Sequence, residues 1–191
     1  MSGERTEAVV VGASAGAIQA LSRILPALPA DYPLPVLVVV HIPADRADLL
    51  APLFRVKCRV VVKEAEDKEP IIPGFVYFGP SDYHLLVEAD RTLSLSVDEP
   101  VLYSRPSIDV LFESAADAYG EGLVGVILTG ANEDGAAGLQ AVAAAGGVAL
   151  AEDPAEAFAP TMPSAALELC AEAQSMSLDQ IAAYLVGLGA A

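Results

Sequence analysis

The feature that most constrains this chain is a series of short, unbroken apolar runs, each ending abruptly in glycine or a polar residue. The clearest is VLVVV at 36–40, which His41 follows directly. AVVV at 8–11 leads into Gly-Ala-Ser-Ala-Gly, and LVGVIL at 123–128 leads into Thr-Gly-Ala-Asn-Glu-Asp. Strands buried on both faces of a parallel sheet have this continuous Val, Ile and Leu pattern. We therefore expect a parallel sheet that helices cover on both sides.

The remaining pattern predicts alternating helices and strands. Helices are expected over 16–25, through Leu49–Phe54, and over 107–119, 135–145, 164–172 and 179–187, with further strands at 58–63, 148–151 and 174–177. Ser107 is expected to cap its helix. The partly alternating runs at 75–79, 84–89 and 92–97 indicate an antiparallel insertion or sheet edge. Together these elements predict the α/β class: one domain, 1–191, with a doubly wound, mostly parallel sheet and an antiparallel hairpin region in a Rossmann-like three-layer sandwich.

Charge and composition exclude several classes of function. The chain carries 26 Asp and Glu against 10 Lys and Arg, a formal net charge of −16, which would repel nucleic acid. No apolar run reaches the roughly 20 residues that span a bilayer. The N-terminal segment lacks the basic and apolar regions of a signal peptide. Because Cys58 and Cys170 have neither metal-binding nor redox spacing, we expect a cytoplasmic protein without membrane insertion.

Polar residues stand where the apolar strands end. In open α/β sheets, functional groups gather beyond the carboxyl ends of the strands. Those positions hold Ser14 after the first strand, His41 after the second, and Thr129, Asn132, Glu133 and Asp134 after the strand at 123–128. A serine, an imidazole base and an orienting carboxylate are the parts needed for nucleophilic acyl transfer. The sequence therefore predicts a serine esterase or amidase.

Ser14 has the surroundings of a nucleophile. Gly12 and Gly16 make a Gly-x-Ser-x-Gly turn between strand and helix. The N–H groups of the following helix, that of Ala15 first, are candidate donors to an oxyanion. The base and the acid are less constrained: His84 is an alternative to His41, and Glu133 and Asp153 are alternatives to Asp134. Asp134 also suits a structural role as an N-cap.

A glycine-rich turn after a strand also fits a nucleotide-binding module. The spacing here is not G-x-G-x-x-G, and His41 stands where an acidic residue would bind a ribose. The order Ser, His, Asp also differs from the Ser, acid, His order of α/β-hydrolases. A nucleotide-binding Rossmann-like protein remains the alternative from another class.

Several longer motifs together resemble the chemotaxis protein-glutamate methylesterase family. They are GASAG, His-Ile-Pro at 41–43, VKEAEDKEPIIPGFVYFGP at 62–80, RPSIDVLFESAA at 105–116, LTGANEDGAAG at 128–138 and MPSAA at 162–166. The resemblance covers about residues 8–186 in the family's order. It implies the doubly wound fold, with Ser14 as nucleophile, His41 as base and Asp134 as the orienting acid. It also implies catalysis without a metal or cofactor.

The resemblance further implies a substrate and its partners. These are methyl-esterified glutamate side chains on the cytoplasmic helices of methyl-accepting chemoreceptors, with glutamine deamidation at some sites. Ala131 and Asn132 replace a Met and a Gly of the usual acid loop, so Ala131 is expected to reshape the oxyanion site. That departure motivates a second alternative, a degenerate member that binds a helical partner without catalysis. About seven residues precede the first strand, so we expect a catalytic domain without the receiver domain, which is either regulated by a separate protein or excised from a longer one.

Four of the ten basic residues fall within nine positions, namely Arg55, Lys57, Arg59 and Lys63. A charged edge strand or helix end would explain them structurally. Alternatively they form a docking patch for an acidic partner. Because a chain of net charge −16 should repel an acidic receptor, we assign the patch to receptor docking, with Arg105 as a second contact near the substrate.

Overall fold

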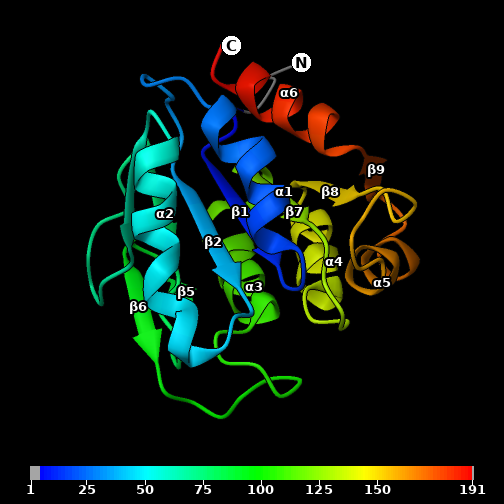
Figure 1. Cartoon of the computed structure of the whole chain (residues 1–191), viewed down its shortest axis with the longest axis horizontal. Coiled ribbons are helices and arrows are strands. Elements are labelled where there is room, and N and C mark those ends of the chain that lie inside the picture. The colour runs from blue at the N-terminus through cyan, green and yellow to red at the C-terminus, as the bar shows by residue number, and fades with distance from the viewer. Residues whose placement is uncertain (1–4, 191) are drawn as a thin grey trace.

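Seven parallel strands form the central sheet in the order β3-β4-β2-β1-β7-β8-β9 (Figure 1). The computed structural model describes residues 5–190, apart from the side chains of Ala44 and Ala47; residues 1–4 and 191 of the expected domain lie outside the described residues. The strands are β1 (Ala8–Ala13), β2 (Val36–Val40), β3 (Val61–Glu64), β4 (Phe75–Phe78), β7 (Leu123–Ile127), β8 (Val148–Glu152) and β9 (Gln174–Met176).

Six α-helices, counted within residues 5–190, cover the two faces of the sheet. One face is covered by α1 (Ala17–Ile24), α2 (Leu50–Lys57) and α6 (Leu178–Leu188), and the other by α3 (Ile108–Tyr119), α4 (Ala136–Ala144) and α5 (Thr161–Leu169) (Figure 1). Short 3₁₀ turns, η1 (Leu25–Ala27), η2 (Ala44–Leu49) and η3 (Gly120–Gly122), join some of them. None of the helices in this part of the chain is both long enough and apolar enough to cross a membrane.

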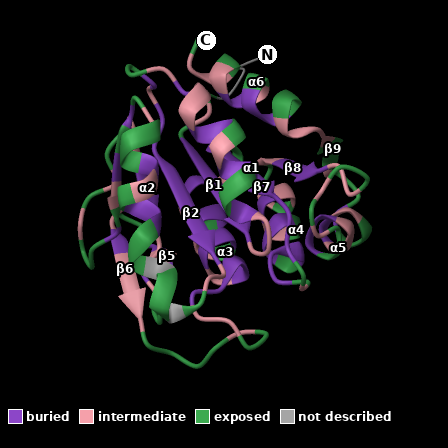
Figure 2. Cartoon of the chain, viewed as in Figure 1, coloured by how far each residue is buried: buried purple, intermediate pink, exposed green. Residues whose placement is uncertain are grey.

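The period-two geometry of the strands divides the core into two layers. In β1, Val9 and Val11 belong to the cluster under α1, α2 and α6, whereas Ala8 and Val10 belong to the cluster under α3, α4 and α5. All six residues of β1 are buried, and the central strands are buried along their length (Figure 2). Burial on both faces explains the unbroken apolar runs. The predicted α/β three-layer class is confirmed.

The run at 75–79 is the exception to the predicted strand arrangement. It was expected in an antiparallel region, but β4 lies inside the main sheet and pairs in parallel with β2 and β3. The antiparallel hairpin is formed by β5 (His84–Val87) and β6 (Leu93–Ser96). Val76, Tyr77 and Phe78 are buried, and the Tyr77 hydroxyl bonds backbone groups of Pro70 and Ile72. The aromatic run therefore marks a strand covered on both faces.

The order of the strands creates a crevice beside β1. The chain leaves β1 through α1 to reach β2 on one side, and it enters β7 on the other side of β1 from α3, which covers the opposite face. Such a reversal of strand order opens a crevice at the carboxyl ends of the strands, where ligands bind in open α/β sheets. The loops after β1, β2 and β7 meet at this edge.

Candidate active site

Backbone hydrogen bonds tie the three strand-end loops together. The N–H of Ser14 donates to Thr129 O (2.9 Å), and the N–H of His41 donates to Ala13 O (3.0 Å). Ser14 and His41 consequently line one cavity of about 340 Å³, together with Ala15, Gly16, Ala17, Ile18, Gln19, Val40, Ile42, Pro43 and Arg46. The sheet thus brings together the two residues expected to act as nucleophile and base.

Gly16 and Thr129 fix the conformation of the turn that carries Ser14. Gly16 has φ +86°, and a Cβ there would lie 2.8 Å from Cβ of Phe158. The Thr129 hydroxyl donates to Ala15 O (2.8 Å) and accepts the N–H of Ala159 (2.8 Å). No acceptor for the N–H of Ala15 is present among the described residues. That N–H, beside Ser14 in the cavity, is free to donate to an oxyanion.

His41 is held by a carboxylate from the loop after β7. Its Nε2 lies 2.7 Å from Oδ2 of Asp134. An ionised carboxylate only accepts, so Nε2 carries the proton and Nδ1 of the neutral ring keeps its lone pair. Asn132 lies beside that nitrogen, with Nδ2 at 3.4 Å, and its Oδ1 accepts the N–H of Asp134 (3.1 Å). The imidazole and the carboxylate are therefore both linked to Asn132.

Asp134 is fully buried and accepts from four donors. Besides His41, they are the hydroxyl of Ser107 (2.9 Å) and the N–H groups of Ile108 (2.7 Å) and Asp109 (3.0 Å). Burial alone would raise the pKa of Asp134, but the hydrogen bonds from His41 and these N–H groups hold that pKa below its ordinary value. The carboxylate is therefore ionised at neutral pH.

The helix-capping roles differ from those expected from the sequence. Ser107 occupies the N-cap position of α3, as expected, but its hydroxyl donates to Asp134 and makes no capping bond to the helix. Asp134 bonds the first N–H groups of α3, whereas Gly135 occupies the N-cap position of α4. The expected structural role of Asp134 therefore exists, but it serves a helix that begins 26 residues earlier in the chain.

The alternative acids and base lie in other environments. Glu133 is exposed, and Asp153 Oδ1 accepts the N–H of Ala155 (2.9 Å). His84 is buried, with Nδ1 accepting the N–H of Ser107 (3.1 Å) and Nε2 lying 2.9 Å from Glu99 O. Both ring nitrogens of His84 are thus bound to backbone, and His84, unlike His41, does not line the cavity that contains Ser14.

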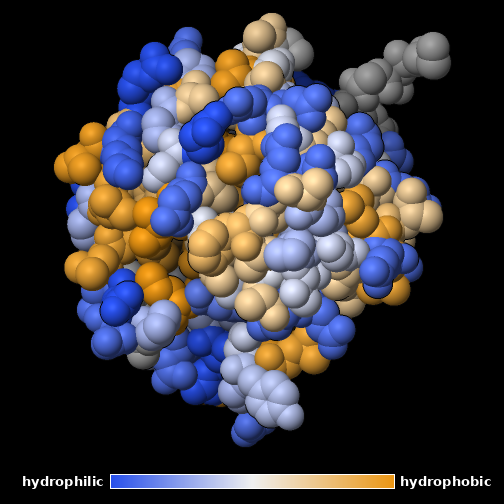
Figure 3. Space-filling view, turned by 45° about the vertical axis from the view of Figure 1, so that its right-hand side comes forward, coloured by the Kyte–Doolittle hydropathy of each residue, from blue (hydrophilic) through white to orange (hydrophobic). Residues whose placement is uncertain are grey.

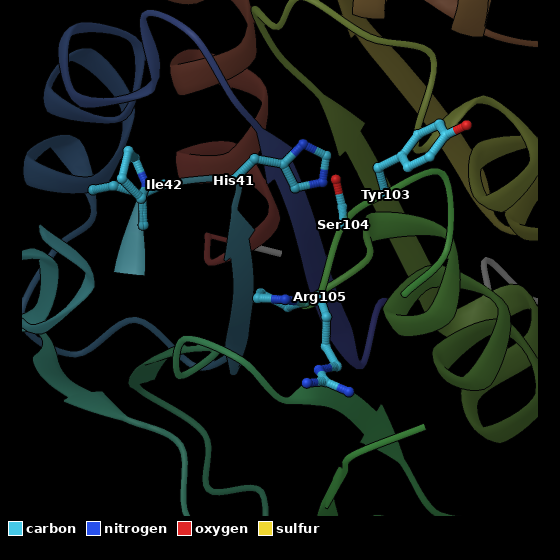
Figure 4. A pocket seen from close by; sticks show the side chains of 7 residues that line it. His41, Ile42, Tyr103, Ser104 and Arg105 are labelled. Carbon is cyan, nitrogen blue, oxygen red and sulfur yellow. The ribbon is translucent and has the colours of Figure 1, made fainter. Parts of the chain in front are cut away.

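Arg105 and Ala131 stand at the margin of the site. Arg105 lines a second cavity, of about 310 Å³, that also borders His41. Its guanidinium donates to Asp82 Oδ1 (2.7 Å) and to the carbonyls of Val97 and Asp98, and it points away from the imidazole (Figure 4). Ala131 is exposed and is not among the residues lining either cavity. Roles for both residues toward the substrate stay predictions.

The basic cluster lies away from Ser14. Helix α2 starts near the carboxyl edge of the sheet and runs back along it, so Arg55 and Lys57 near its C-terminal end and Arg59 before β3 lie toward the amino edge of the strands (Figure 1). Lys63 bonds Glu69 (2.6 Å) and Glu66 (3.5 Å), which neutralise its charge locally. By contrast, Arg46, which the motifs did not single out, lines the Ser14 cavity. Any docking by the cluster would involve a substrate that extends beyond this cavity.

Comparison with known proteins identifies the family. The protein-family model described as CheB methylesterase matches residues 9–185 of the chain. The chain belongs to the CheB methylesterase family. The CheB methylesterase catalytic domain of Thermotoga maritima has the same fold, with a TM-score of 0.92 and 34% sequence identity over 96% of this chain and 98% of that domain.

Two relatives in the CheB methylesterase family differ in length. A protein of Leptospira interrogans, provisionally named protein-glutamate methylesterase/protein-glutamine glutaminase, is 46% identical over 182 residues, covering 95% of this chain and 94% of the relative. A protein of Bordetella parapertussis named protein-glutamate methylesterase/protein-glutamine glutaminase is 42% identical over 177 residues, or 91% of this chain and 50% of the relative. The chain thus spans about half the length of the second relative.

A serine, an imidazole and a carboxylate lie at this edge of the sheet. Within residues 5–190, His, Cys, Asp and Glu side chains do not gather into a group of three that could hold a metal ion. Motif reasoning missed Ser107 and Asp109 as partners of the acid, because both contact it from a helix that is distant in sequence. The RPSID motif, in which both residues stand, was the available signal.

Proposed function

We propose that this protein hydrolyses methyl esters of glutamate side chains on the cytoplasmic helices of chemoreceptors, and deamidates glutamine side chains at the same site, in the cytoplasm. The observation that carries the proposal is the bond between His41 and Asp134, next to the cavity that His41 shares with Ser14. The names of the relatives in the CheB methylesterase family supply the substrate class.

The first half of the reaction forms an acyl-enzyme. Ser14 Oγ attacks the side-chain carbonyl carbon while Nδ1 of His41 takes the hydroxyl proton, and Asp134 stabilises the imidazolium. The negative charge on the carbonyl oxygen is met by the N–H of Ala15 at the start of α1. His41 then gives its proton to the departing methoxide, or to the amine when the substrate is glutamine. Methanol or ammonia leaves.

Hydrolysis of the acyl-enzyme completes the cycle. His41 takes a proton from water, and the resulting hydroxide attacks the ester carbonyl of the acyl-enzyme. Collapse of the second tetrahedral intermediate breaks the bond to Ser14 Oγ, which recovers its proton from His41. The products are a glutamate carboxyl group and a free enzyme, so the balance requires only water.

The surroundings of the cavity suit a protein substrate. Ile18 lines it and is 40% exposed, and Leu49, three residues after the cavity-lining Arg46, is 63% exposed. Figure 3 shows that hydrophobic side chains gather toward the left of the displayed face, between hydrophilic areas. An exposed apolar side chain beside the cavity, such as Ile18, favours a partner that brings its own apolar surface, such as an amphipathic helix.

Methanol release from a methylated receptor fragment tests the proposal. Purified protein mixed with a cytoplasmic chemoreceptor fragment methylated at glutamate is expected to release methanol in proportion to the methyl groups present. An unmethylated fragment serves as the blank. A nucleotide-binding module or a non-catalytic binder would release none, so the absence of methanol above this blank would overturn the esterase assignment for this substrate.

A second prediction concerns charge. We propose that positive charge near the cavity and along α2 offsets the repulsion between two acidic proteins. Arg46→Glu is expected to raise KM for the receptor fragment about 10-fold, and the double change Lys57→Glu with Arg59→Glu about 3-fold, with kcat nearly unchanged because no reacting group is altered. Raising the salt concentration should shrink both differences.

Charge-neutral changes provide the comparison for this experiment. Arg46→Gln and the double change Lys57→Gln with Arg59→Gln should give smaller effects than the corresponding glutamate variants. An unchanged KM at low ionic strength in the double reversal would remove the basic cluster from receptor docking, and an unchanged KM in Arg46→Glu would remove Arg46.

A further inference from the structure

Two helix N-termini meet behind the catalytic residues, and each is bound by an acid from the other. Asp134 directly precedes the start of α4, yet its carboxylate accepts the N–H groups of Ile108 and Asp109 at the start of α3. Asp109, in the first turn of α3, accepts the N–H groups of Gly135 (2.9 Å) and Gly138 (2.7 Å) at the start of α4. The carboxylate next to each helix N-terminus therefore binds the N-terminus of the other helix.

Glycines allow this exchange by bringing the two helices close together. A Cβ at Gly138 would lie 2.7 Å from Cβ of Phe112 and 3.1 Å from Cα of Asp109, so a side chain there would push α4 away from α3. Gly135 has φ +105°, and a Cβ there would lie 2.6 Å from Cδ1 of Ile127. The backbone on the C-terminal side of Asp134 is therefore packed tightly against α3.

We propose that Asp109 is the positioning residue that sets the location of Asp134, and through it the orientation of His41. Asp109 holds Asp134 from two sides: its own N–H donates to Oδ1 of Asp134, and its carboxylate binds the residue that follows Asp134. This inference rests on the proposed function, because it takes Asp134 as the orienting acid of the triad.

The contacts of Asp109 allow its role as a hydrogen-bond acceptor to be tested separately from its negative charge. Both N–H groups of α4 donate to the same atom, Oδ1. Asparagine keeps an oxygen at that position, whereas alanine removes it and leaves two N–H groups without that acceptor. Burial, aided by the charge of Asp134, raises the pKa of Asp109 to about 6, so the neutral amide also avoids part of the cost of placing a charge there.

The kinetic test compares Asp109→Ala with Asp109→Asn. Misplacing an orienting group by about 1 Å costs on the order of 100-fold in rate. Asp109→Ala is therefore expected to lower kcat for methanol release by about 10- to 100-fold with KM changed less than about 3-fold, and Asp109→Asn to restore kcat to within about 3-fold. Glu113→Gln, an exposed charge removal one turn later in α3, is the matched control and should behave like the wild type.

A spectroscopic measurement tests the same idea without turnover. The chain has two histidines, so ¹⁵N-labelling of histidine yields two ring systems to assign. The Nε2 proton of His41, bonded to Asp134, should give a downfield signal in the wild type and in Asp109→Asn. In Asp109→Ala it should shift upfield or disappear, while the signals of His84 persist and report that the fold is intact.

The outcomes are distinguishable from failure of the proposed function. Wild-type kcat together with an unchanged His41 signal in Asp109→Ala would overturn the positioning role. Equal damage in Asp109→Asn and Asp109→Ala would overturn it as well, because the acceptor oxygen would then not be the determinant. If the wild type releases no methanol, the esterase assignment fails, and the His41 signal still decides whether Asp109 positions the pair.

Discussion

Replacing Ser14 with alanine is expected to lower kcat for methanol release by at least about 10⁴-fold, because the variant has no group to form the acyl-enzyme. The same change should leave the free energy of unfolding within about 0.5 kcal/mol of the wild type. Ser14 is half-buried, and its hydroxyl makes no hydrogen bond to any residue in the part of the chain that the structure describes. The two measurements are methanol release and urea denaturation of the same preparations.

Ser104 provides the control for this experiment. It lines the second cavity beside His41, and its hydroxyl points toward the imidazole (Figure 4). Ser104→Ala is expected to keep kcat within about 3-fold of the wild type, because Ser104 does not lie in the glycine-flanked turn at a helix N-terminus that would stabilise an oxyanion. Activity retained by Ser14→Ala and lost by Ser104→Ala would reverse the assignment of the nucleophile.

The sheet was predictable because its signal is local. Each central strand is buried on both faces, so all of its residues are apolar and form an unbroken run in the sequence. The run at 36–40 has the same bounds as β2. The prediction for β4 is wrong because FVYF precedes two runs that do form a hairpin, and adjacency in sequence favours a shared antiparallel sheet. Its parallel pairing depends on β2 and β3, which lie elsewhere in the chain.

In the candidate site, too, some residues could be located from the sequence and others could not. Ser14 and His41 follow strands that can be located from sequence, so their shared edge follows from the topology of parallel sheets. The choice between Glu133 and Asp134 did not follow from position, since the two are neighbours in one loop. It depends on the N-terminus of α3, which contributes Ser107, Ile108 and Asp109 as donors from about 25 residues away. Only the family resemblance carried that information in the sequence.

The second large effect is expected when Asp134, which accepts hydrogen bonds from four donors, is replaced. Asp134→Asn is expected to lower kcat by about 10³- to 10⁴-fold, since an amide cannot hold the neutral imidazole in the tautomer with its proton on Nε2. Its NH₂ group would also face two donors, whichever way the amide is turned. Two bonds would be replaced by donor–donor contacts, which should lower the free energy of unfolding by about 2–4 kcal/mol.

The pH dependence of the unfolding free energy distinguishes the loss of the Asp134 carboxylate from a general loss of stability. The folded state holds the pKa of Asp134 below its ordinary value of 3.8, so its ionised form contributes stability that is fully present above that value and is lost as the pH falls through the folded pKa. The difference in unfolding free energy between wild type and Asp134→Asn should therefore be constant above about pH 7, where Asp109, whose pKa is about 6 in the wild type, is ionised in both proteins. It should shrink in strong acid, as the pH falls through the folded pKa of Asp134. Glu133→Gln, an exposed change one residue away, should alter neither stability nor kcat appreciably. If Glu133→Gln lost activity and Asp134→Asn kept it, the orienting acid would be Glu133, and the buried carboxylate would serve only to join α3 to the loop after β7.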